Sequence, residues 1–267
     1  KAEQRRIPSR PLREEYYKSL HYVRYADDFI IGVIGSKEDA ENLKADLAVF
    51  LKEKMGLTLS DEKTKITHSA ERARFLGYDI SVSRSQEIRR KKNGVKARLY
   101  TGVVKLYVPH EKWESKLREF GAIRIIKNPD GKDRWKAIHR GKLINHTDIE
   151  ILRKYNAEVR GLYNYYSLAC NASTISKFSS LMKWSMLKTF AAKYRTKVSK
   201  IKKRYVKNGD FTVPYATKAG IKEAVYYNKG FKRQDKPMFG QVDMLETYKR
   251  YDKPNSLACK LRTKTCE

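Results

Sequence analysis

The sequence predicts an α+β protein in which a β-hairpin, a helix and a second β-hairpin precede a mainly helical region and a basic tail. Two apolar runs rich in β-branched residues flank an acidic pair, which predicts the first hairpin. Apolar residues then recur at helical spacing over residues 40–55 and again over residues 149–190. The tail, from residue 193 onward, is expected to be mostly helical or irregular.

Two adjacent aspartates, Asp27 and Asp28, interrupt the first apolar run. Val23 precedes them and residues 29–34 continue the apolar run, so a tight turn is expected at the acidic pair. A solvated hairpin tip is one interpretation, because Asp is common in turns. The other is a site for a hard cation, because neighbouring carboxylates repel each other and are costly to bury without a counter-charge.

A capped helix is predicted after this hairpin. Ser36 is the expected N-cap, Asp39 stands at the third helical position, and Gly56 is expected to end the helix. Residues 57–60 should begin an extended segment, and the Phe75-Leu76-Gly77-Tyr78 motif should form a turn. Gly77 suits a tight turn or close approach of the backbone to a ligand because it has no Cβ atom, although an ordinary strand turn would also use glycine.

Composition limits the class of protein. The 267 residues include 59 Lys and Arg against 30 Asp and Glu, a net charge of +29 that favours a polyanionic partner, and nucleic acid fits best. A membrane surface also attracts basic chains, but no apolar run approaches the ~18 residues of a spanning helix, and we see no secretory signal. The three cysteines lack Cys-x-x-Cys spacing, so we expect no disulfide framework and a reducing, cytoplasmic location, in a bacterial cell or an organelle. Lys1 stands where a complete chain would begin with Met, so we expect a piece of a longer protein.

Residues 83–98 are polar and strongly basic. Asn93-Gly94 predicts a hairpin or loop there, and residues 103–109 predict a short strand that runs into a turn. The positive charge favours contact with phosphate groups, although a solvated basic loop would have the same composition. The cations are Arg84, Arg89, Arg90, Lys91, Lys92, Lys96 and Arg98. We expect a domain boundary after residue 108.

The region that follows, residues 109–192, should be mostly helical. A short amphipathic helix is predicted over residues 110–120, a turn over residues 128–131 and irregular or extended structure over residues 134–143. Thr147 should cap a longer helix that packs on a second one over residues 175–194. The predicted apolar stripes are Ile149, Leu152, Asn156, Val159, Leu162, Tyr163 and Tyr166 on the first helix, and Phe178, Leu181, Met182, Ser185, Met186, Thr189 and Phe190 on the second. For Tyr163 and Tyr166 we favour a core role.

The tail carries cations with no acidic residue until Asp210. Like charges at this density weaken an isolated helix, which favours a polyanionic partner over the alternative of a disordered solubilising tail. Aromatic residues are interleaved with these cations, and their rings can stack on unpaired bases. They include Phe211, Tyr215, Tyr226, Tyr227 and Phe239.

Taken in order, these motifs resemble group II intron-encoded reverse transcriptases, also called maturases, over nearly the whole chain. The Tyr25-Ala26-Asp27-Asp28 tetrad resembles the catalytic hairpin of the palm, and residues 59–68 and 75–80 resemble later palm segments. Residues 160–169 and 183–189 resemble the maturase or thumb domain, and the tail resembles the DNA-binding region. Cys266-Glu267 matches only the first two residues of the Cys-Glu-x-Cys motif that opens an endonuclease domain in relatives, so no nuclease activity is inferred.

The resemblance implies a division into an N-terminal lead-in (1–20), the carboxy-terminal part of a palm (21–82), a basic loop and strand connector (83–108), a helical thumb or maturase domain (109–192), and a DNA-binding region with a truncated endonuclease start (193–267). It implies an RNA-directed DNA polymerase, a nucleotidyltransferase, that is also the splicing maturase of a mobile group II intron. Two Mg²⁺ ions would bind at Asp27 and Asp28 as catalytic residues, with a third carboxylate ligand missing from this chain. On its own, the fragment should bind RNA but polymerise poorly.

The resemblance also implies site residues and partners. Phe75, Leu76, Gly77 and Tyr78 correspond to the primer grip. Expected nucleic-acid contacts are Tyr25, Arg84, Arg89, Arg90, Lys91, Lys92, Arg160, Lys183, Lys188, Lys200, Lys202, Lys203 and Arg204. Expected partners are group II intron RNA, target DNA, the duplex of RNA template and DNA primer, and the remaining palm and fingers polypeptide, with no membrane.

Two other functions stay open. One is a splicing-only RNA-binding maturase whose palm is a non-catalytic scaffold. The other is a different palm-fold enzyme, such as a cyclic-dinucleotide synthase, which would leave the thumb-like and basic segments unexplained.

Overall fold

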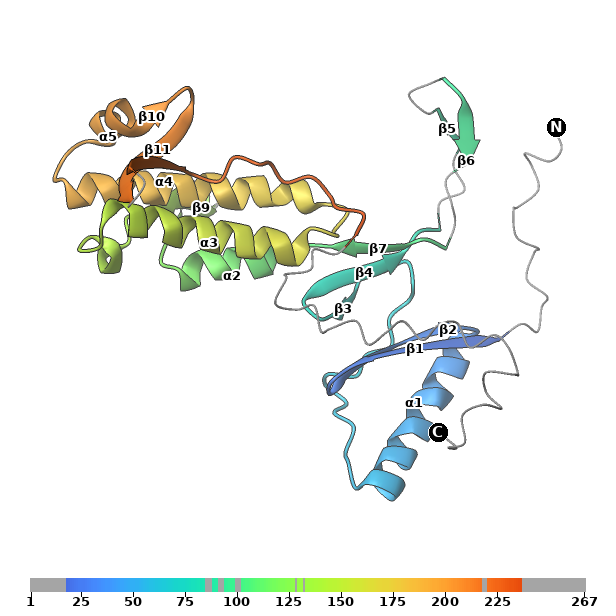
Figure 1. The fold of residues 1–267 in the computed structure, drawn as a ribbon. Helices are drawn as coiled ribbons and strands as arrows, with labels where there is room; N and C mark the ends of the chain where they lie inside the picture. The colour runs from blue at the N-terminus through green and yellow to red at the C-terminus, as the bar shows by residue number, and fades with distance from the viewer. Residues whose placement is uncertain are drawn as a thin grey trace, which may run out of the picture.

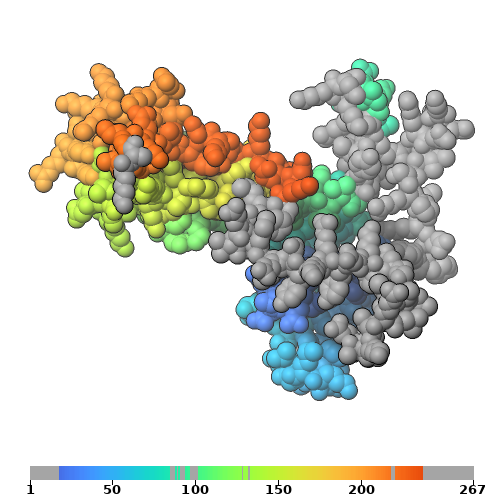
Figure 2. Space-filling model, viewed as in Figure 1, coloured from blue at the N-terminus to red at the C-terminus, as the bar shows by residue number. Residues whose placement is uncertain are grey.

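The fold mixes helices and strands in two parts joined through a small sheet (Figure 1). The structure, a computed structural model, describes residues 18–84, 88–90, 94–98, 102–127, 129–131, 133–217 and 220–236. In the space-filling view of the same orientation, the N-terminal elements gather in one body and the helical elements form an elongated arm (Figure 2). The predicted mixture of helix and strand is confirmed.

The N-terminal part begins with the predicted hairpin. Strands β1 (Ser19–Tyr25) and β2 (Asp28–Ile34) pair antiparallel, from Ser19 opposite Ile34 to Tyr25 opposite Asp28. Helix α1 (Lys37–Met55) follows and lies beside this hairpin (Figure 1). No residue of α1 is buried, so this helix shields little apolar surface from water among the described residues.

Both ends of α1 follow from local chemistry. The Ser36 side chain accepts a hydrogen bond from the Asp39 amide at 3.1 Å, and the Asp39 carboxylate accepts one from the Ser36 amide at 2.8 Å. This reciprocal capping box satisfies two amides that the helix itself leaves unpaired. Gly56 ends the helix in the left-handed conformation, as predicted. No strand forms over residues 57–60.

A second hairpin connects the two parts. Strands β3 (Ala73–Phe75), β4 (Tyr78–Val82) and β7 (Val104–Tyr107) form an antiparallel sheet in that order. Strands β5 (Ile88–Arg90) and β6 (Lys96–Arg98) form the hairpin expected around residues 93–94. The short strand predicted over residues 103–109 is confirmed as β7.

The helical part is built on two long helices. Helices α3 (Asp148–Tyr166) and α4 (Ile175–Lys193) lie side by side, and α2 (His110–Glu119) packs against α4 (Figure 1). Two single-turn 3₁₀ helices, Gly141–Leu143 and Ala172–Thr174, precede the long helices. Fully buried side chains fill the space between α3 and α4, including Leu152, Tyr155, Val159, Phe178, Met182 and Met186.

The predicted stripes are largely confirmed. Every named residue of the α4 stripe except Leu181 is buried. On α3 the stripe is shifted: Ile151 and Tyr155 are buried, although the predicted stripe omits them. Ile149, Asn156 and Leu162, which belong to the predicted stripe, are only half-buried. The expected core role of Tyr163 and Tyr166 is confirmed, because they are 5% and 4% exposed.

The expectation that residues 109–192 are mostly helical misses one hairpin. Strands β8 (Ile123–Lys127) and β9 (Asp133–Ala137) pair with Ile125 opposite Trp135. Trp135 packs edge-on against Trp113 of α2, with ring centroids 5.1 Å apart. Ile123 is buried, and this apolar contact with the helices stabilises a hairpin that would be marginal alone.

The tail is the clearest correction. Residues 193–236 were expected to be mostly helical or irregular, but α5 (Val198–Tyr205) is followed by a three-stranded antiparallel sheet. Its strands are β10 (Val206–Lys207), β11 (Asp210–Thr217) and β12 (Gly220–Val225). The reason lies in the burial of three consecutive residues of β11: Phe211, Thr212 and Val213 are 0%, 5% and 1% exposed, so this sheet completes the helical core.

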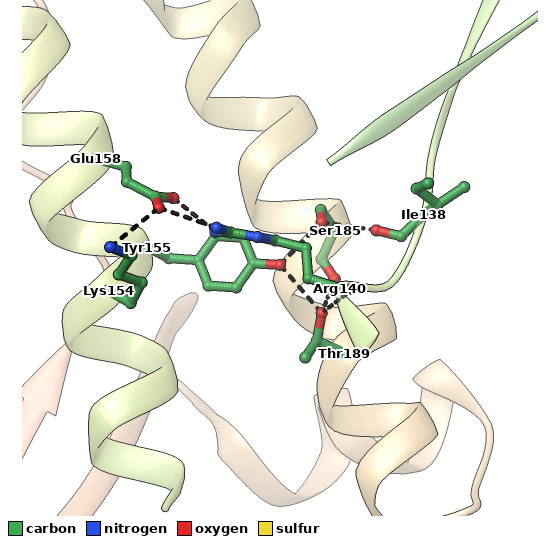
Figure 3. Close-up of polar contacts among 7 residues, drawn as sticks. All are labelled: Ile138, Arg140, Lys154, Tyr155, Glu158, Ser185 and Thr189. Carbon is green, nitrogen blue, oxygen red and sulfur yellow. Dashed lines mark hydrogen bonds and ion pairs between the residues drawn. The ribbon is translucent and has the colours of Figure 1, made fainter. Parts of the chain in front are cut away.

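A largely buried polar network fixes the relative position of α3, α4 and the segment after β9 (Figure 3). The Arg140 guanidinium donates two hydrogen bonds to the Glu158 carboxylate, at 2.6 and 3.0 Å. The Tyr155 hydroxyl lies 2.9 Å from Ser185 Oγ and 3.0 Å from Thr189 Oγ1. Ser185 in turn donates to the carbonyl of residue 138 at 2.6 Å. Buried polar groups that are fully paired in this way specify one arrangement of the helices.

Candidate metal and nucleic-acid site

The acidic pair lies at the tip of the β1–β2 hairpin. Tyr25 and Asp28 form the last residue pair of the ladder, so the connecting turn consists of Ala26 and Asp27. Ala26 has a φ of 50°, a left-handed conformation that costs a non-glycine residue ~1–2 kcal/mol. Arg24 supports the turn by donating from Nε to the Ala26 carbonyl at 2.7 Å. The predicted tight turn is confirmed, with Asp28 beginning the second strand.

The two carboxylates are available to a cation. Both residues are exposed, and within the described ranges no hydrogen bond or ion pair engages either side chain. Carboxylate oxygens are the ligands that Mg²⁺ prefers. No group of three or more His, Cys, Asp or Glu residues that could hold a metal ion occurs in the described part of the chain. The donor set therefore fits part of a magnesium site and leaves room for further ligands.

The Phe75–Tyr78 segment forms the predicted turn, with Phe75 paired to Tyr78 across the β3–β4 ladder. Leu76 and Gly77, the two turn residues, have φ values of 46° and 74°. A Cβ atom at position 77 would lie 3.4 Å from the Tyr166 hydroxyl and 3.5 Å from the Tyr165 hydroxyl. Gly77 is thus suited both to the left-handed turn and to close contact with α3.

Three tyrosines join this turn to the end of α3. Tyr165 donates a hydrogen bond to the Leu76 carbonyl at 2.5 Å, and Tyr166 donates one to the Gly77 carbonyl at 3.0 Å. In the other direction, the Tyr78 hydroxyl donates to the Tyr165 carbonyl. Burial, reinforced by the neighbouring phenols, raises the pKa of Tyr78 to about 12, so its hydroxyl keeps its proton at neutral pH. No pattern in the sequence indicates the role of Tyr165, which lies outside the apolar stripe.

The predicted phosphate contacts of the connector are partly described. Arg84 is exposed and donates to Ser69 Oγ from Nε at 3.0 Å. Arg90 is exposed on β5, and only the backbone of Arg89 is described. Lys91 and Lys92 lie outside the described residues. Tyr25, at the acidic hairpin, is 66% exposed.

The predicted cations of α3 and α4 have different surroundings. Arg160 is exposed on α3. Lys183 lies with its Nζ 5.9 Å from the Tyr226 ring centroid. Lys188 donates from Nζ to the Ala137 carbonyl at 2.6 Å, so its ammonium is already used inside the fold.

Helix α5 carries the densest described group of cations. Ile201 and Tyr205 anchor it in the core. The rest of its surface carries four exposed cations with no acidic partner among the described residues: Lys200, Lys202, Lys203 and Arg204. A hollow of about 520 Å³ adjoins the start of α5, lined by Ala191, Ala192, Arg195, Thr196, Lys197 and Lys200. We refer to these four cations and this hollow as the α5 surface.

An exposed tryptophan, which the sequence does not single out as a site residue, lies beside the α5 surface. Trp184 of α4 is 46% exposed, and Lys202 Nζ lies 4.1 Å from the centroid of its ring. An exposed indole among cations can stack on a base. By contrast, Phe211 and Tyr226 are 0% and 3% exposed, so the expectation that these two rings stack on bases is wrong. Phe239 lies outside the described residues.

A half-buried carboxylate joins α5 to the long helices. Asp148, at the start of α3, accepts hydrogen bonds from Lys193 at 2.6 Å, Tyr194 at 2.6 Å and Tyr205 at 2.5 Å. Burial by itself would raise the pKa of Asp148, but the three donors together outweigh it and hold that pKa below its usual value. Asp148 therefore joins the end of α5 to the start of α3 and the end of α4.

The fold combines a hairpin that carries two exposed carboxylates with a helical part that carries exposed cations, a combination that fits a nucleic-acid-binding protein. A family profile described as type II intron maturase matches residues 101–251, and one described as reverse transcriptase (RNA-dependent DNA polymerase) matches residues 7–80. The chain belongs to the group II intron-encoded reverse transcriptase and maturase family, so the predicted resemblance is confirmed.

Curated relatives agree with this placement. Group II intron-encoded protein LtrA of Lactococcus lactis subsp. cremoris is 40% identical over 269 residues, covering 98% of this chain and 43% of the relative. Putative COX1/OXI3 intron 2 protein of Saccharomyces cerevisiae is 31% identical over 253 residues, covering 92% of this chain and 28% of the relative. Nuclear intron maturase 2, mitochondrial, of Arabidopsis thaliana is 26% identical over 208 residues, covering 76% of this chain and 27% of the relative. The chain spans less than half the length of each.

Among the helices that the structure describes, none combines the length and the apolar character that crossing a bilayer requires.

Proposed function

We propose that this chain is the carboxy-terminal portion of an RNA-directed DNA polymerase that also acts as a splicing maturase for a group II intron. The observation that carries the proposal is the pair of exposed carboxylates, Asp27 and Asp28, on a hairpin tip, with no protein partner among the described residues. A scaffold that only bound RNA would have no chemical need for two repelling charges at this position. A metal site would use both.

Asp27 and Asp28 would hold catalytic Mg²⁺. When bound, the metal activates the primer 3′-hydroxyl and stabilises charge on the leaving group. The chain's own contribution is positional: the β1–β2 ladder fixes where the two carboxylates stand, and the Phe75–Tyr78 turn would hold the primer end as the primer grip. Since the described residues offer only two such ligands, we propose that a third carboxylate comes from another part of the palm.

Exposed apolar side chains support a role for further palm and fingers residues. On β1, Tyr22 and Val23 are 53% and 56% exposed. On α1, Val49 and Phe50 are 53% and 49% exposed. Neighbouring apolar side chains at this level of exposure are typical of a surface that packs against more protein. We propose that the remaining palm and fingers polypeptide covers them, and that this chain alone polymerises poorly.

The helical part and the α5 surface would bind nucleic acid. We propose that residues 109–192 act as the thumb or maturase domain, with residues 83–108 as the connector, and contact the template–primer duplex and intron RNA. Residues from 193 onward would contact target DNA during intron homing. Support comes from the exposed cations of α5 and the exposed Trp184, because Lys and Arg contact phosphates and an indole can stack on a base. Such partners place the protein inside a cell.

A splicing-only maturase is the second candidate. It is favoured by the fact that the helical core and the α5 surface are built without any contribution from Asp27 or Asp28. The two candidates differ in whether the carboxylates are needed.

The experiment measures primer extension on an RNA template and intron splicing in parallel, with the chain joined to the remaining palm and fingers. For Asp27→Ala we expect extension to fall at least about a hundredfold, because metal stabilisation of the transition state is worth several kcal/mol, while splicing continues. The matched control is Asp61→Ala, an exposed acid that lies 3.0 Å from Lys44 in an ion pair. Extension that survives Asp27→Ala would rule out the metal site. A wild-type protein that extends primers but does not support splicing would rule out the maturase role.

A further inference from the structure

We propose that Tyr165 and Tyr166 are positioning residues: they clamp the Leu76–Gly77 turn to the end of α3, so that the helical part sets where the primer terminus lies. The inference rests on the proposed primer-grip function of this turn. It adds that the position of the turn is set by residues of α3, which lies outside the palm. We call the three tyrosines, Tyr78, Tyr165 and Tyr166, the tyrosine clamp.

The geometry of the clamp is specific. Two consecutive turn carbonyls, those of Leu76 and Gly77, each accept a hydrogen bond from a different tyrosine hydroxyl, at 2.5 and 3.0 Å. A two-residue turn usually leaves such carbonyls to solvent. Here both are taken by adjacent residues of a distant helix, and each donor lies 89 positions after its acceptor in the sequence.

The contact is reciprocal. Tyr78, the residue after the turn, donates its hydroxyl to the Tyr165 carbonyl, which belongs to the last turn of α3. The last four carbonyls of a helix have no partner within the helix, so Tyr78 satisfies one of them. The three rings pack together, with centroids 5.6 Å apart for Tyr78 and Tyr165, 5.0 Å for Tyr78 and Tyr166, and 4.8 Å for the adjacent pair.

Backbone conformation indicates that the turn needs this support. Leu76 has a φ of 46°, which costs a residue with a Cβ atom ~1–2 kcal/mol. Such conformations persist where surrounding contacts determine them, and they are frequent at ligand-binding sites. The Tyr165 hydroxyl bonds to the carbonyl of this same residue, so the clamp acts on the strained position itself.

A second attachment restricts movement between the sheet and the helices. Asn171, in the connection between α3 and α4, accepts a hydrogen bond from the Val108 amide at 2.7 Å and donates one to the Val108 carbonyl at 3.2 Å. The Cys170 amide donates to the Leu106 carbonyl at 2.7 Å. The sheet is therefore held at β7 and at the β3–β4 turn, and a shift of α3 on binding a duplex would carry the turn with it.

The experiment uses the 267-residue chain with an RNA template and a DNA primer that ends in 4-thiothymidine, a photo-crosslinking base. Crosslinked peptides are mapped, and the duplex Kd is measured separately. We compare the wild type with Tyr165→Phe, Tyr166→Phe and the double variant, which remove hydroxyls and keep the rings. The matched control is Tyr163→Phe, whose hydroxyl donates to the Lys232 carbonyl at 2.7 Å, away from the turn.

We expect the wild-type primer terminus to crosslink within residues 75–78. The share of crosslinks there should fall roughly fivefold for each hydroxyl removed, the factor that corresponds to one ordinary hydrogen bond, while Kd stays within about twofold. Tyr163→Phe should leave the crosslink share unchanged. Amide hydrogen exchange of the turn, measured without nucleic acid, should speed up in all three clamp variants and not in the control.

Two results would overturn the inference in distinguishable ways. If the wild type crosslinks at residues 75–78 and the double variant does the same, the clamp has no positioning role and the primer-grip function stands. If the wild type itself gives no crosslink at residues 75–78, the primer-grip function fails and the inference fails with it.

Discussion

Glu158→Ala should strongly destabilise the helical part. The Arg140 and Glu158 side chains are 11% and 8% exposed and share two hydrogen bonds, at 2.6 and 3.0 Å. Removing one partner of a buried pair leaves the other charge uncompensated, at a cost of about 3–5 kcal/mol. We expect the lower end, about 3 kcal/mol, because Arg140 keeps its contact with the Tyr155 ring, 5.0 Å from the guanidinium carbon to the ring centroid.

Urea unfolding followed by circular dichroism measures this change in free energy. The matched control is Glu41→Ala, which removes an exposed pair with Lys37 at 3.4 Å and should cost less than about 0.5 kcal/mol. If Glu158→Ala fails to fold, the double variant Arg140→Met with Glu158→Leu should still fold with nearly wild-type stability, because apolar replacements leave no buried charge. A cost below about 1 kcal/mol for Glu158→Ala, or collapse of the double variant, would refute the reasoning.

Three further predictions concern the turn, acid and salt. Gly77→Ala should lower the free energy of unfolding by about 1–2 kcal/mol in urea titrations, because alanine is strained at positive φ; an unchanged midpoint would contradict this. Since the pKa of Asp148 is lowered in the fold, the stability it contributes should be present above its unfolded pKa, about 3.9, and lost as pH falls below that value. Acid titration of the wild type beside Asp148→Asn checks this, and equal acid sensitivity would refute it. The logarithm of the affinity for RNA should fall linearly with the logarithm of the salt concentration. The double variant Lys200→Gln with Lys203→Gln should make this slope shallower by roughly 0.7–0.9 for each phosphate group that is no longer neutralised. The control variant Lys37→Gln should leave the slope unchanged.

Local chemistry explains why the N-terminal part could be predicted from the sequence. The capping box at Ser36 and Asp39, the glycine at the end of α1 and the acidic turn each depend on residues within a few positions of one another. The prediction for the tail is wrong because the density of cations outweighed a turn signal. Asn208-Gly209, with φ values of 50° and 86°, is a strong hairpin signal, and the apolar residues Phe211 and Val213 alternate with Thr212 in the sequence as is typical of a strand.

The candidate site divides in the same way. Its acidic pair and its glycine turn are local motifs, so the sequence reveals both. The tyrosine clamp joins residues separated by 89 positions, and nothing near Tyr165 in the sequence indicates its partner. Likewise, Lys188 donates a hydrogen bond to the Ala137 carbonyl only because β9 packs against α4. The positive charge of Lys188 in the sequence does not indicate this contact.

The central claim is that Asp27 and Asp28, at the tip of the β1–β2 hairpin, bind a metal ion next to the bound nucleic acid. Iron-mediated cleavage tests it directly: Fe²⁺ replaces Mg²⁺ on the chain bound to a template–primer duplex together with the remaining palm and fingers, and hydroxyl radicals cut the backbone near the metal. We predict cleavage within residues 24–30 that excess Mg²⁺ suppresses and that Asp27→Asn with Asp28→Asn abolishes. Cleavage confined to other segments, or cleavage at the tip that persists in the double variant, would contradict this claim.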